Sequence, residues 1–485
     1  MAVPPTRAHI RTLFLRILGV IFVIAFVSIL VQVDVLIGSR GLLPAQAYLD
    51  ALRGSARFID VPTVFWLDCS DRALHAVAIA GAGISLGLIL NIAPRYCLLV
   101  LWMLYLSFVN VGQDFFSFQW DNLLLESAFF SLFITPGGVR PRHPPPPHPI
   151  AVFLMLWLVF RLHVESGAAK LLTGDPTWRD LTAMVSYYET APLPTWLGWY
   201  AHQMPLWAHQ GCALFTFFVE LLLPLFMWAP SPVRVIVFLF MIAMQVSIVL
   251  TANYGFFNYL SMAVCLFVLD DRHLQWLAAR FGWGLPPAPA RPRQAWRTAL
   301  LGVTAAVLVP ASIVPFLRFF PSTEGLEPRL MPVRRVLSSI RSINPYHLFA
   351  SMTLVRREVV IEGSDDGETW QTYEFRYKPG DPDRAPPFVA PHQPRLDFQL
   401  WFLLLGGPPR ARYFNTLLER LLIEPTAVAP LFARDPFPLT PPRALRLAFY
   451  RYTFTDIATR RASGAWWHRE RLGYSTSIDA AALRR

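Results

Sequence analysis

Long apolar segments separated by short polar stretches fill the first two thirds of the chain. A helix needs about 20 mostly apolar residues to cross a bilayer, and about nine segments approach that length. The candidate spans are residues 13–33, 73–90, 96–111, 123–135, 150–172, 212–228, 233–251, 256–269 and 299–319. Several of them are short, which leaves room for one re-entrant pair. The pattern predicts a multi-pass α-helical membrane bundle with about nine spans.

The pattern changes near residue 320, where charged residues and turn formers replace the long apolar segments. Residues 370–377 alternate between aromatic and polar side chains, which is the period of a half-buried strand. Strands are also predicted over residues 357–361 and 444–455, and an amphipathic helix over residues 413–423. The last third of the chain is therefore expected to be a soluble α+β domain.

A short turn motif makes the expectation for the soluble domain more specific. Asp366-Gly367 favours a tight turn between two strands. Together with Ser364 and Trp370, its spacing resembles a hairpin found in discoidin-like β-sandwiches. We expect a transmembrane helical domain over residues 1–320, followed by a β-sandwich-like α+β domain over residues 321–485.

Composition agrees with a membrane protein. Hydrophobic residues make up 54% of the chain and charged residues 15%, whereas soluble proteins carry about 25% charged residues. The net charge of +11 comes from basic residues that lie between apolar segments, a pattern typical of topology signals. No basic helix with interleaved stacking aromatic residues is evident. The expected partner is therefore the lipid bilayer and not nucleic acid.

The Arg residues also indicate an orientation, because short cytoplasmic loops are enriched in basic residues. With a cytoplasmic N-terminus, the outside loops at residues 113–121 and 252–255 contain no Arg. The inside loops then hold Arg95, Arg140, Arg142, Arg234, Arg272, Arg280, Arg291, Arg293 and Arg297. An odd number of spans places the C-terminal domain outside the cytoplasm, in the periplasm of a bacterium or in the lumen of the endoplasmic reticulum.

Ionisable residues cluster on the fifth candidate span, where a charge is costly unless it has a partner or a role. Arg161 and Glu165 are four residues apart and can pair on one helix face, and Glu126 can pair with Arg161. His163 and Lys170 share another face. Two interpretations stay open. The cluster either fixes the packing of the helices, with Lys170 extending to the membrane–water interface, or it lines a ligand cavity.

Polar and aromatic residues also mark the outside surface. Trp120 and Asp121 are expected there, with Trp120 as part of an aromatic belt. The outside loop at residues 173–210 is rich in Pro, Trp and Tyr, which suggests a segment that lies on the membrane surface or braces the soluble domain. Its candidate residues are Trp178, Arg179, Asp180, Tyr188, Glu189 and Thr190.

Catalytic and metal-binding signatures are not evident. There is no nucleophile elbow with a Ser-His-Asp arrangement and no phosphate-cradling Gly-rich loop. His347 and His392 are too isolated for zinc, which needs three or four converging ligands. Arg395 and Asp397 are expected in a polar network. We therefore predict no catalytic residue, no metal and no cofactor.

Four stretches, taken together and in order, resemble the lipase maturation factor family. The first is the segment at residues 119–126, with Trp120, Asp121 and Glu126. The second combines Gly167-Ala168-Ala169-Lys170-Leu171, Gly174-Asp175, Trp178-Arg179-Asp180-Leu181-Thr182 and Tyr188-Glu189-Thr190. The third contains Asn344-Pro345-Tyr346, Met352-Thr353, Arg356 and the segment at residues 362–367. The fourth contains Tyr377-Lys378-Pro379-Gly380-Asp381, His392-Gln393-Pro394-Arg395-Leu396-Asp397 and Trp466-Trp467.

The resemblance implies a chaperone-like, multi-pass membrane protein that assists the folding or assembly of secreted lipases. In animals such proteins lie in the membrane of the endoplasmic reticulum. This chain has Tyr187 where a His is expected, and its basic residues are Arg apart from Lys170 and Lys378. A GC-rich bacterial genome would produce that bias, and the protein would then lie in the bacterial inner membrane. The predicted partner is a secreted lipase or another client protein.

Two other functions stay open. The family is distantly similar to the transmembrane bundle of vitamin K-dependent carboxylase, so the alternative is a membrane enzyme that acts on a lipid or quinone-like substrate. Lys170, His163 and Glu165 would then be its acid–base groups. A transporter of lipid or polymer is the third hypothesis, although no inverted repeat supports it.

Overall fold

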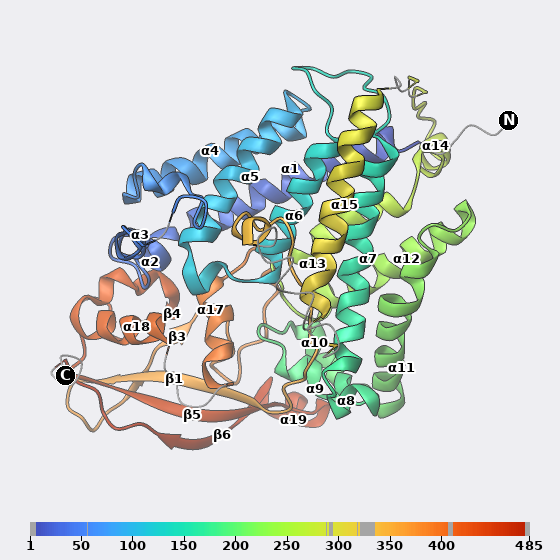
Figure 1. Cartoon of the computed structure of the whole chain (residues 1–485). Coiled ribbons are helices and arrows are strands. Elements are labelled where there is room, and N and C mark those ends of the chain that lie inside the picture. Colours follow the sequence, from blue (N-terminus) through green and yellow to red (C-terminus); the bar gives the residue numbers. More distant parts are fainter. Residues whose placement is uncertain are drawn as a thin grey trace.

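The long apolar segments form a bundle of helices in the computed structural model, which describes residues 6–55, 57–287, 289–290, 294–317, 319–320, 335–405 and 411–480. Seven helical segments in these ranges are long and apolar enough to span a membrane. They are α1 (Ala8–Leu30), α4 (Asp71–Ile89), α5 (Pro94–Val111), α7 (Pro149–Leu172), Leu206–Phe226, α12 (Ser231–Thr251) and α15 (Ala295–Leu317). Figure 1 shows them above and to the right of the C-terminal sheet. Arg291 and Arg293 of the orientation argument lie outside the described residues.

Two of the predicted spans form shorter helices. Residues 123–135 belong to α6 (Gln119–Ile134), and residues 256–269 to α13 (Phe257–Cys265) with a following 3-10 turn. Within the described residues α13 packs against α1, α6 and α7, so it lies in the interior of the bundle (Figure 1). Seven long spans are thus present, and the prediction of about nine is not confirmed.

The fifth long segment, Leu206–Phe226, is not one regular helix. It begins as α11 (Leu206–Phe217), continues through a π-helical turn at Phe218–Leu222 and ends in a 3-10 turn at Leu223–Phe226. Single π-helical turns re-aim side chains and are frequent at functional sites. Here the turn carries Glu220, the acidic residue of this segment.

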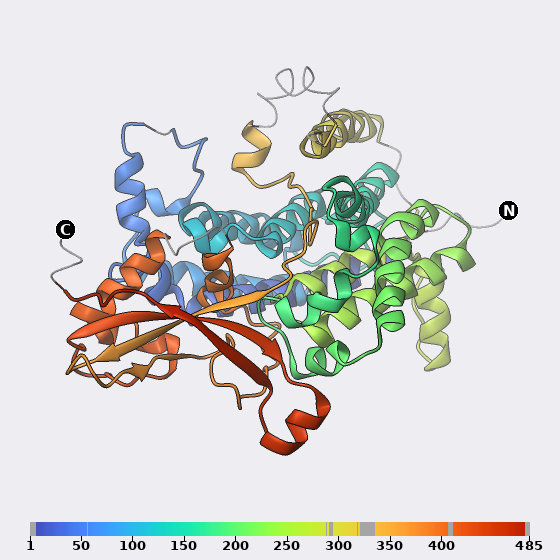
Figure 2. The same cartoon turned by 90° about the horizontal axis from the view of Figure 1, so that it is seen from below.

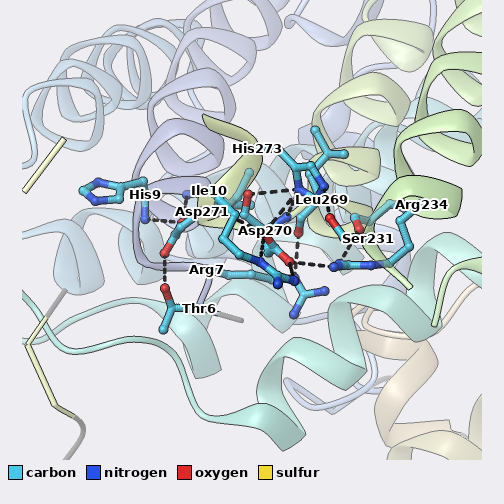
Figure 3. A network of polar contacts seen from close by, with 12 residues as sticks. Thr6, Arg7, His9, Ile10, Ser231, Arg234, Leu269, Asp270, Asp271 and His273 are labelled. Carbon is cyan, nitrogen blue, oxygen red and sulfur yellow. Dashed lines mark hydrogen bonds and ion pairs between the residues drawn. The ribbon is translucent and has the colours of Figure 1, made fainter. Parts of the chain in front are cut away.

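The end of the bundle near the N-terminus is held by a network of polar contacts (Figure 3). Arg7, at the N-cap of α1, makes no side-chain capping bond. The carboxylate of Asp271 accepts hydrogen bonds from the amides of Ala8, His9 and Ile10 at 2.7, 2.9 and 3.1 Å. Asp271 opens α14 (Asp271–Arg280), so one end of α1 is capped from a distant helix.

Asp270, next to that cap, is the centre of a second group of contacts (Figure 3). Its buried carboxylate pairs with Arg234 of α12 at 2.6 Å and with Arg272 at 2.8 Å. Burial raises the pKa of Asp270, but the hydrogen bonds from Arg272 and Arg234 prevail and hold it well below the ordinary value. These pairs tie α12 to the start of α14.

Short helices lie at the opposite end of the bundle, beside the sheet (Figure 1). Residues 173–210 form three of them before α11 begins. They are α8 (Pro176–Arg179), α9 (Ala183–Thr190) and α10 (Trp196–His202). Two more, α2 (Val33–Ile37) and α3 (Ala45–Leu52), follow α1.

The C-terminal part is built on a four-stranded antiparallel sheet with the order β2-β1-β5-β6. A second sheet pairs two short strands, β3 and β4. The strands are β1 (Arg356–Ser364), β2 (Gln371–Thr372), β3 (Glu374–Phe375), β4 (Phe432–Arg434), β5 (Ala444–Phe454) and β6 (Trp467–Tyr474). The helices are α17 (Arg395–Leu400), α18 (Arg412–Ile423) and α19 (Ile457–Ser463). The long pair of β5 and β6 is clear in Figure 2, with α19 at the connection.

Most predicted elements of this part are confirmed, with one difference. The predicted strand at residues 370–377 is divided, because β2 pairs with β1 whereas β3 pairs with β4. Tyr373 and Phe375 are nevertheless buried, as the alternation predicted. The edge strand β6 was not predicted, since it is largely exposed and has no alternation of apolar residues. An α+β composition is present, and the likeness to a β-sandwich stays a prediction.

Candidate functional site

The predicted cluster on α7 lies at the junction between the bundle and the C-terminal part. Arg161 pairs with Glu126 of α6 at 2.6 Å and with Glu165 at 2.9 Å. All three side chains are buried. The predicted pairing of these residues is confirmed, and it places two carboxylates around one guanidinium.

Two predicted residues of the C-terminal part complete this cluster. Arg161 donates to the carbonyl of Asn344 at 2.6 Å, and the Asn344 amide donates to Glu126 at 2.9 Å. The Tyr346 hydroxyl also donates to Glu126 at 2.8 Å, and its amide donates to Glu165 at 3.1 Å. The polar atoms of a buried charge cluster must be satisfied, and this segment supplies the remaining partners.

A second buried pair joins α17 to α6. Arg395 makes two bonds of 2.8 Å to the carboxylate of Asp121. The hydroxyl of Tyr105 donates to the same carboxylate at 2.5 Å. The Arg395 guanidinium also lies 3.6 Å from the centre of the Phe116 ring. A planar, bidentate pair of this kind fixes the orientation of α17 as well as its position.

The surface positions expected for Trp120 and Asp121 are wrong. Asp121 is fully buried, and Trp120 is 3% exposed. Trp120 packs against Phe118 and Phe398, whose ring centres are 4.6 and 4.8 Å away. The sequence places these residues near a span end, but the C-terminal part covers that end and replaces water or lipid there.

Lys170 lies near the end of α7, and its side chain is paired inside the protein instead of extending to the membrane–water interface. Its ammonium pairs with Glu220 at 2.7 Å and donates to the carbonyl of Leu348 at 3.1 Å. Both charged side chains are buried. A Cβ at Gly167 would lie 2.8 Å from the Cβ of Glu220, so this glycine allows α7 to approach the π-helical turn closely.

The loop at residues 173–210 contacts the C-terminal part through hydrogen bonds that each involve a backbone atom. The Trp178 indole donates to the carbonyl of Phe349 at 2.9 Å. Glu189 accepts from the amide of Phe454 at 2.7 Å, and the carbonyl of Thr190 accepts from Trp401 at 2.8 Å. Tyr188 is buried beside them, whereas Arg179 and Asp180 are exposed.

Arg356 of β1 reaches back to that loop. It donates to the carbonyls of Glu189 and Pro192 at 3.1 and 3.0 Å. It also pairs with Glu358 at 2.6 Å, and Lys378 pairs with the other oxygen of Glu358 at 2.8 Å. Burial raises the pKa of Glu358, but Lys378 and Arg356 prevail and hold it below the ordinary value.

The segment with His392 and Gln393 docks on α1. Ser28 lies 3.0 Å from Nδ1 of His392 and accepts from the amide of Gln393 at 3.2 Å. Gly255 meets the same segment, since a Cβ there would lie 2.5 Å from Gln393 and its φ is +56°. Asp397 accepts two bonds of 2.9 Å from the amides of residues 377 and 378. The predicted polar network around Arg395 and Asp397 is therefore present.

Several residues of these networks were not among the predicted site residues. They are Glu358, Lys378, Tyr105 and Ser28. The scarcity of Lys in the chain could have drawn attention to Lys378, whereas Glu358 lies among other charged residues of its strand and does not stand out. Tyr105 and Ser28 carry no such signal, because aromatic and hydroxyl side chains are ordinary in apolar helices.

A cavity of about 950 Å³ lies at the junction, beside the Lys170–Glu220 pair. Its lining comes from the bundle and from the C-terminal part, and it includes His163, Lys170, Glu220, Phe349 and Phe402. His163 and Lys170, predicted to share a face, thus border one space. Within the described ranges no group of three or more His, Cys, Asp or Glu residues could hold a metal ion.

Comparisons with known proteins agree with the motifs. Two family models match, the lipase maturation factor transmembrane domain over residues 9–276 and the lipase maturation factor C-terminal domain over residues 342–477. Lipase maturation factor 1 of Mus musculus is 33% identical over 97% of this chain and 88% of its own length. Lipase maturation factor 2 of Gallus gallus is 32% identical over 97% of this chain and 81% of its own length. No solved structure matches the chain. This protein therefore belongs to the lipase maturation factor family.

Proposed function

We propose that this protein is a membrane-anchored, chaperone-like maturation factor that helps secreted lipases reach their active fold or assembly. The observation that carries the proposal is the match to lipase maturation factors, which extends over both the bundle and the C-terminal part. The action we propose is non-covalent. The protein holds exposed apolar surface of an immature lipase until that surface is buried in the folded enzyme.

The proposed topology puts the client side outside the cytoplasm. The Arg-rich loops favour a cytoplasmic N-terminus, and both seven and nine spans are odd numbers. The C-terminal domain, from residue 321 onward, then lies on the same side as the loop at residues 173–210. Their shared contacts support a single working unit, which meets clients in the periplasm or in the lumen of the endoplasmic reticulum.

An aromatic surface beside the sheet is the client contact that we propose. Trp196 is 40% exposed, Tyr200 53% and Phe388 43%. The ring centre of Trp196 is 6.1 Å from that of Tyr200 and 5.6 Å from that of Phe388. Exposed apolar groups that adjoin one another favour binding to a second apolar surface. The three side chains come from the outside loop and from the C-terminal part, so the surface depends on their docking.

Coexpression with a secreted lipase in a host that lacks the gene tests the role. We expect the complete chain to raise the specific activity of the secreted lipase several-fold at an unchanged transcript level. The variant Trp196→Ala/Tyr200→Ala/Phe388→Ala should lose most of that gain, with an unchanged melting temperature. The matched control is Leu439→Ala/Leu472→Ala, which removes exposed apolar side chains elsewhere. Unchanged specific activity for every secreted lipase tested would contradict the proposal.

The alternative of a membrane enzyme is less well supported by the geometry. A general base needs an available lone pair, whereas the ammonium of Lys170 is engaged by Glu220, Ser166 and the carbonyl of Leu348. The relatives carry names of maturation factors. Loss of lipase maturation in Lys170→Arg, with the fold and client binding retained, would favour the enzyme.

A further inference from the structure

The cavity beside the Lys170–Glu220 pair has a mainly apolar wall. Helix α12 and the residues around α13 contribute Met244, Ile248 and Phe257, and the C-terminal part contributes Phe398 and Phe402. A volume of about 950 Å³ falls in the range of about 300–1,000 Å³ that is typical of small-molecule sites. The cavity is partly open, and its border includes residues of the long apolar helices α7 and α12.

Four side chains of the lining carry a buried polar atom that has no hydrogen-bond partner in the described part of the chain. The atoms are Nε2 of His163, Oε1 of Gln119, Oε1 of Gln399 and Nε1 of Trp120. Buried polar atoms are nearly always paired in folded proteins, and each unpaired one calls for an explanation. Four of them in side chains that line one cavity indicate a ligand that carries hydrogen-bonding groups, which modest movements of these side chains bring within its reach.

The chemistry of these atoms specifies the ligand. Nδ1 of His163 lies 2.8 Å from the carbonyl of Val159. A carbonyl only accepts, so Nδ1 carries the proton and Nε2 of the neutral ring is an acceptor. The two Gln oxygens are also acceptors, and the Trp120 indole is a donor. Three acceptors and one donor match a group that both donates and accepts, which is the property of a hydroxyl.

The charges beside the cavity argue for an uncharged ligand. Glu220 neutralises Lys170 at 2.7 Å, and Ser166 and the carbonyl of Leu348 take the remaining donors of the ammonium. No unpaired cation among the described lining residues is then available for a carboxylate or a phosphate. An anionic head group would meet acceptors instead, and a buried charge without a partner is costly.

We propose that this cavity binds a neutral long-chain amphiphile with a hydroxyl head group, of the monoacylglycerol type. The chain lies along the apolar wall, and its hydroxyl groups meet His163, Gln119 and Gln399. The site does not depend on the client role, because it is defined by the cavity alone. Its occupant joins the walls from the bundle and from the C-terminal part, and so holds the two together.

Direct binding tests this site in the complete protein. The protein is placed in phosphatidylcholine nanodiscs and titrated with tritiated 1-oleoylglycerol in a scintillation proximity assay. We expect saturable binding of one molecule per chain, with competition by oleate or by lysophosphatidylglycerol at least tenfold weaker than by unlabelled 1-oleoylglycerol. His163→Leu should weaken binding about tenfold, since it removes one buried acceptor.

Variants that fill the cavity separate this site from general lipid adsorption. Ile248→Trp in the bundle, and Ser351→Trp in the C-terminal part of the lining, should abolish saturable binding. The matched control is Val246→Trp on the same helix, where the side chain is 39% exposed and outside the lining. Absence of saturable binding, equal competition by oleate, or full binding by both cavity-filled variants would overturn the proposal.

Discussion

At the residue scale, this protein buries charged side chains near the junction of its two parts, and Arg161, Lys170 and Arg395 are each paired there with a carboxylate. A buried ion pair adds little net stability, but removal of one partner leaves an uncompensated charge in a low dielectric. Arg161, Lys170 and Arg395 each face carboxylates, and each also donates to a backbone carbonyl of a different segment. The pairs therefore specify which segments meet.

The Arg395–Asp121 pair gives a sharp test at this scale. Arg395→Ala leaves the fully buried carboxylate of Asp121 without its bidentate partner, so we expect a loss of about 3–5 kcal/mol in unfolding free energy. Arg395→Met/Asp121→Leu should recover most of that loss. The melting temperature in detergent reports both, with the exposed Arg412→Ala as the control. Equal loss in the single and the double variant would exclude an electrostatic cause.

At the element scale, one helix start, that of α1, receives its cap from a distant part of the chain. The start of α1 has no capping side chain of its own, and Asp271 satisfies three of its amides. The side of the bundle near the N-terminus is therefore closed by contacts between α1, α12 and α14. Because an N-terminal cap contributes about 1 kcal/mol, these contacts hold a helix end in place more than they drive folding.

Asp271→Ala should loosen the start of α1 without unfolding the bundle. The amides of residues 8–10 lose their acceptor, so their hydrogen exchange should rise at least tenfold while amides in the middle of α1 stay protected. Exchange measured by mass spectrometry on the N-terminal peptide reports this change. The comparison variant is Asp68→Ala, an exposed carboxylate near the start of α4. Uniform loosening of all helices would instead indicate a role in global stability.

The neighbouring Asp270 makes stability depend on pH in acid. Its pKa is held below the ordinary value by Arg272 and Arg234 against the effect of burial. The contribution is therefore complete above about pH 4 and is lost as the pH falls through the lower folded value. We expect Asp270→Asn to lower the melting temperature by a constant amount between pH 5 and 7 and to approach the wild type in stronger acid. Asp383→Asn, on the surface, should show no such pattern.

At the scale of the whole molecule, the bundle and the C-terminal part form one body. Arg356 reaches the loop at residues 173–210, Trp178 reaches the segment before β1, and Arg161 reaches Asn344. These contacts enclose the cavity and bring together the exposed aromatic surface of Trp196 and Phe388. A change in the docking of the two parts would therefore alter both features together.

Arg356→Met tests that coupling, with its neighbour Arg357→Met as the exposed control. Loss of the guanidinium leaves Glu358 with Lys378 alone and frees the carbonyls of Glu189 and Pro192. We expect hydrogen exchange to rise in both α9 and β1, and the gain in lipase activity to fall, while α1 and α4 stay protected. A rise confined to β1 would show that the loop and the domain do not act together.

The sequence by itself determined the family, the presence of many long apolar spans but not their number, the change of pattern near residue 320 and the pairing of Arg161 with Glu165. Each of these depends on composition or on local spacing, which a linear pattern contains. Only the tertiary structure decided that Asp121 is buried by Arg395, that Lys170 meets Glu220 and that a cavity lies beside this second pair. Asp121 and Arg395 are 274 residues apart in the chain. Contacts at such separations follow from how whole elements pack, because side-chain periodicity reports which face is buried but not what covers it.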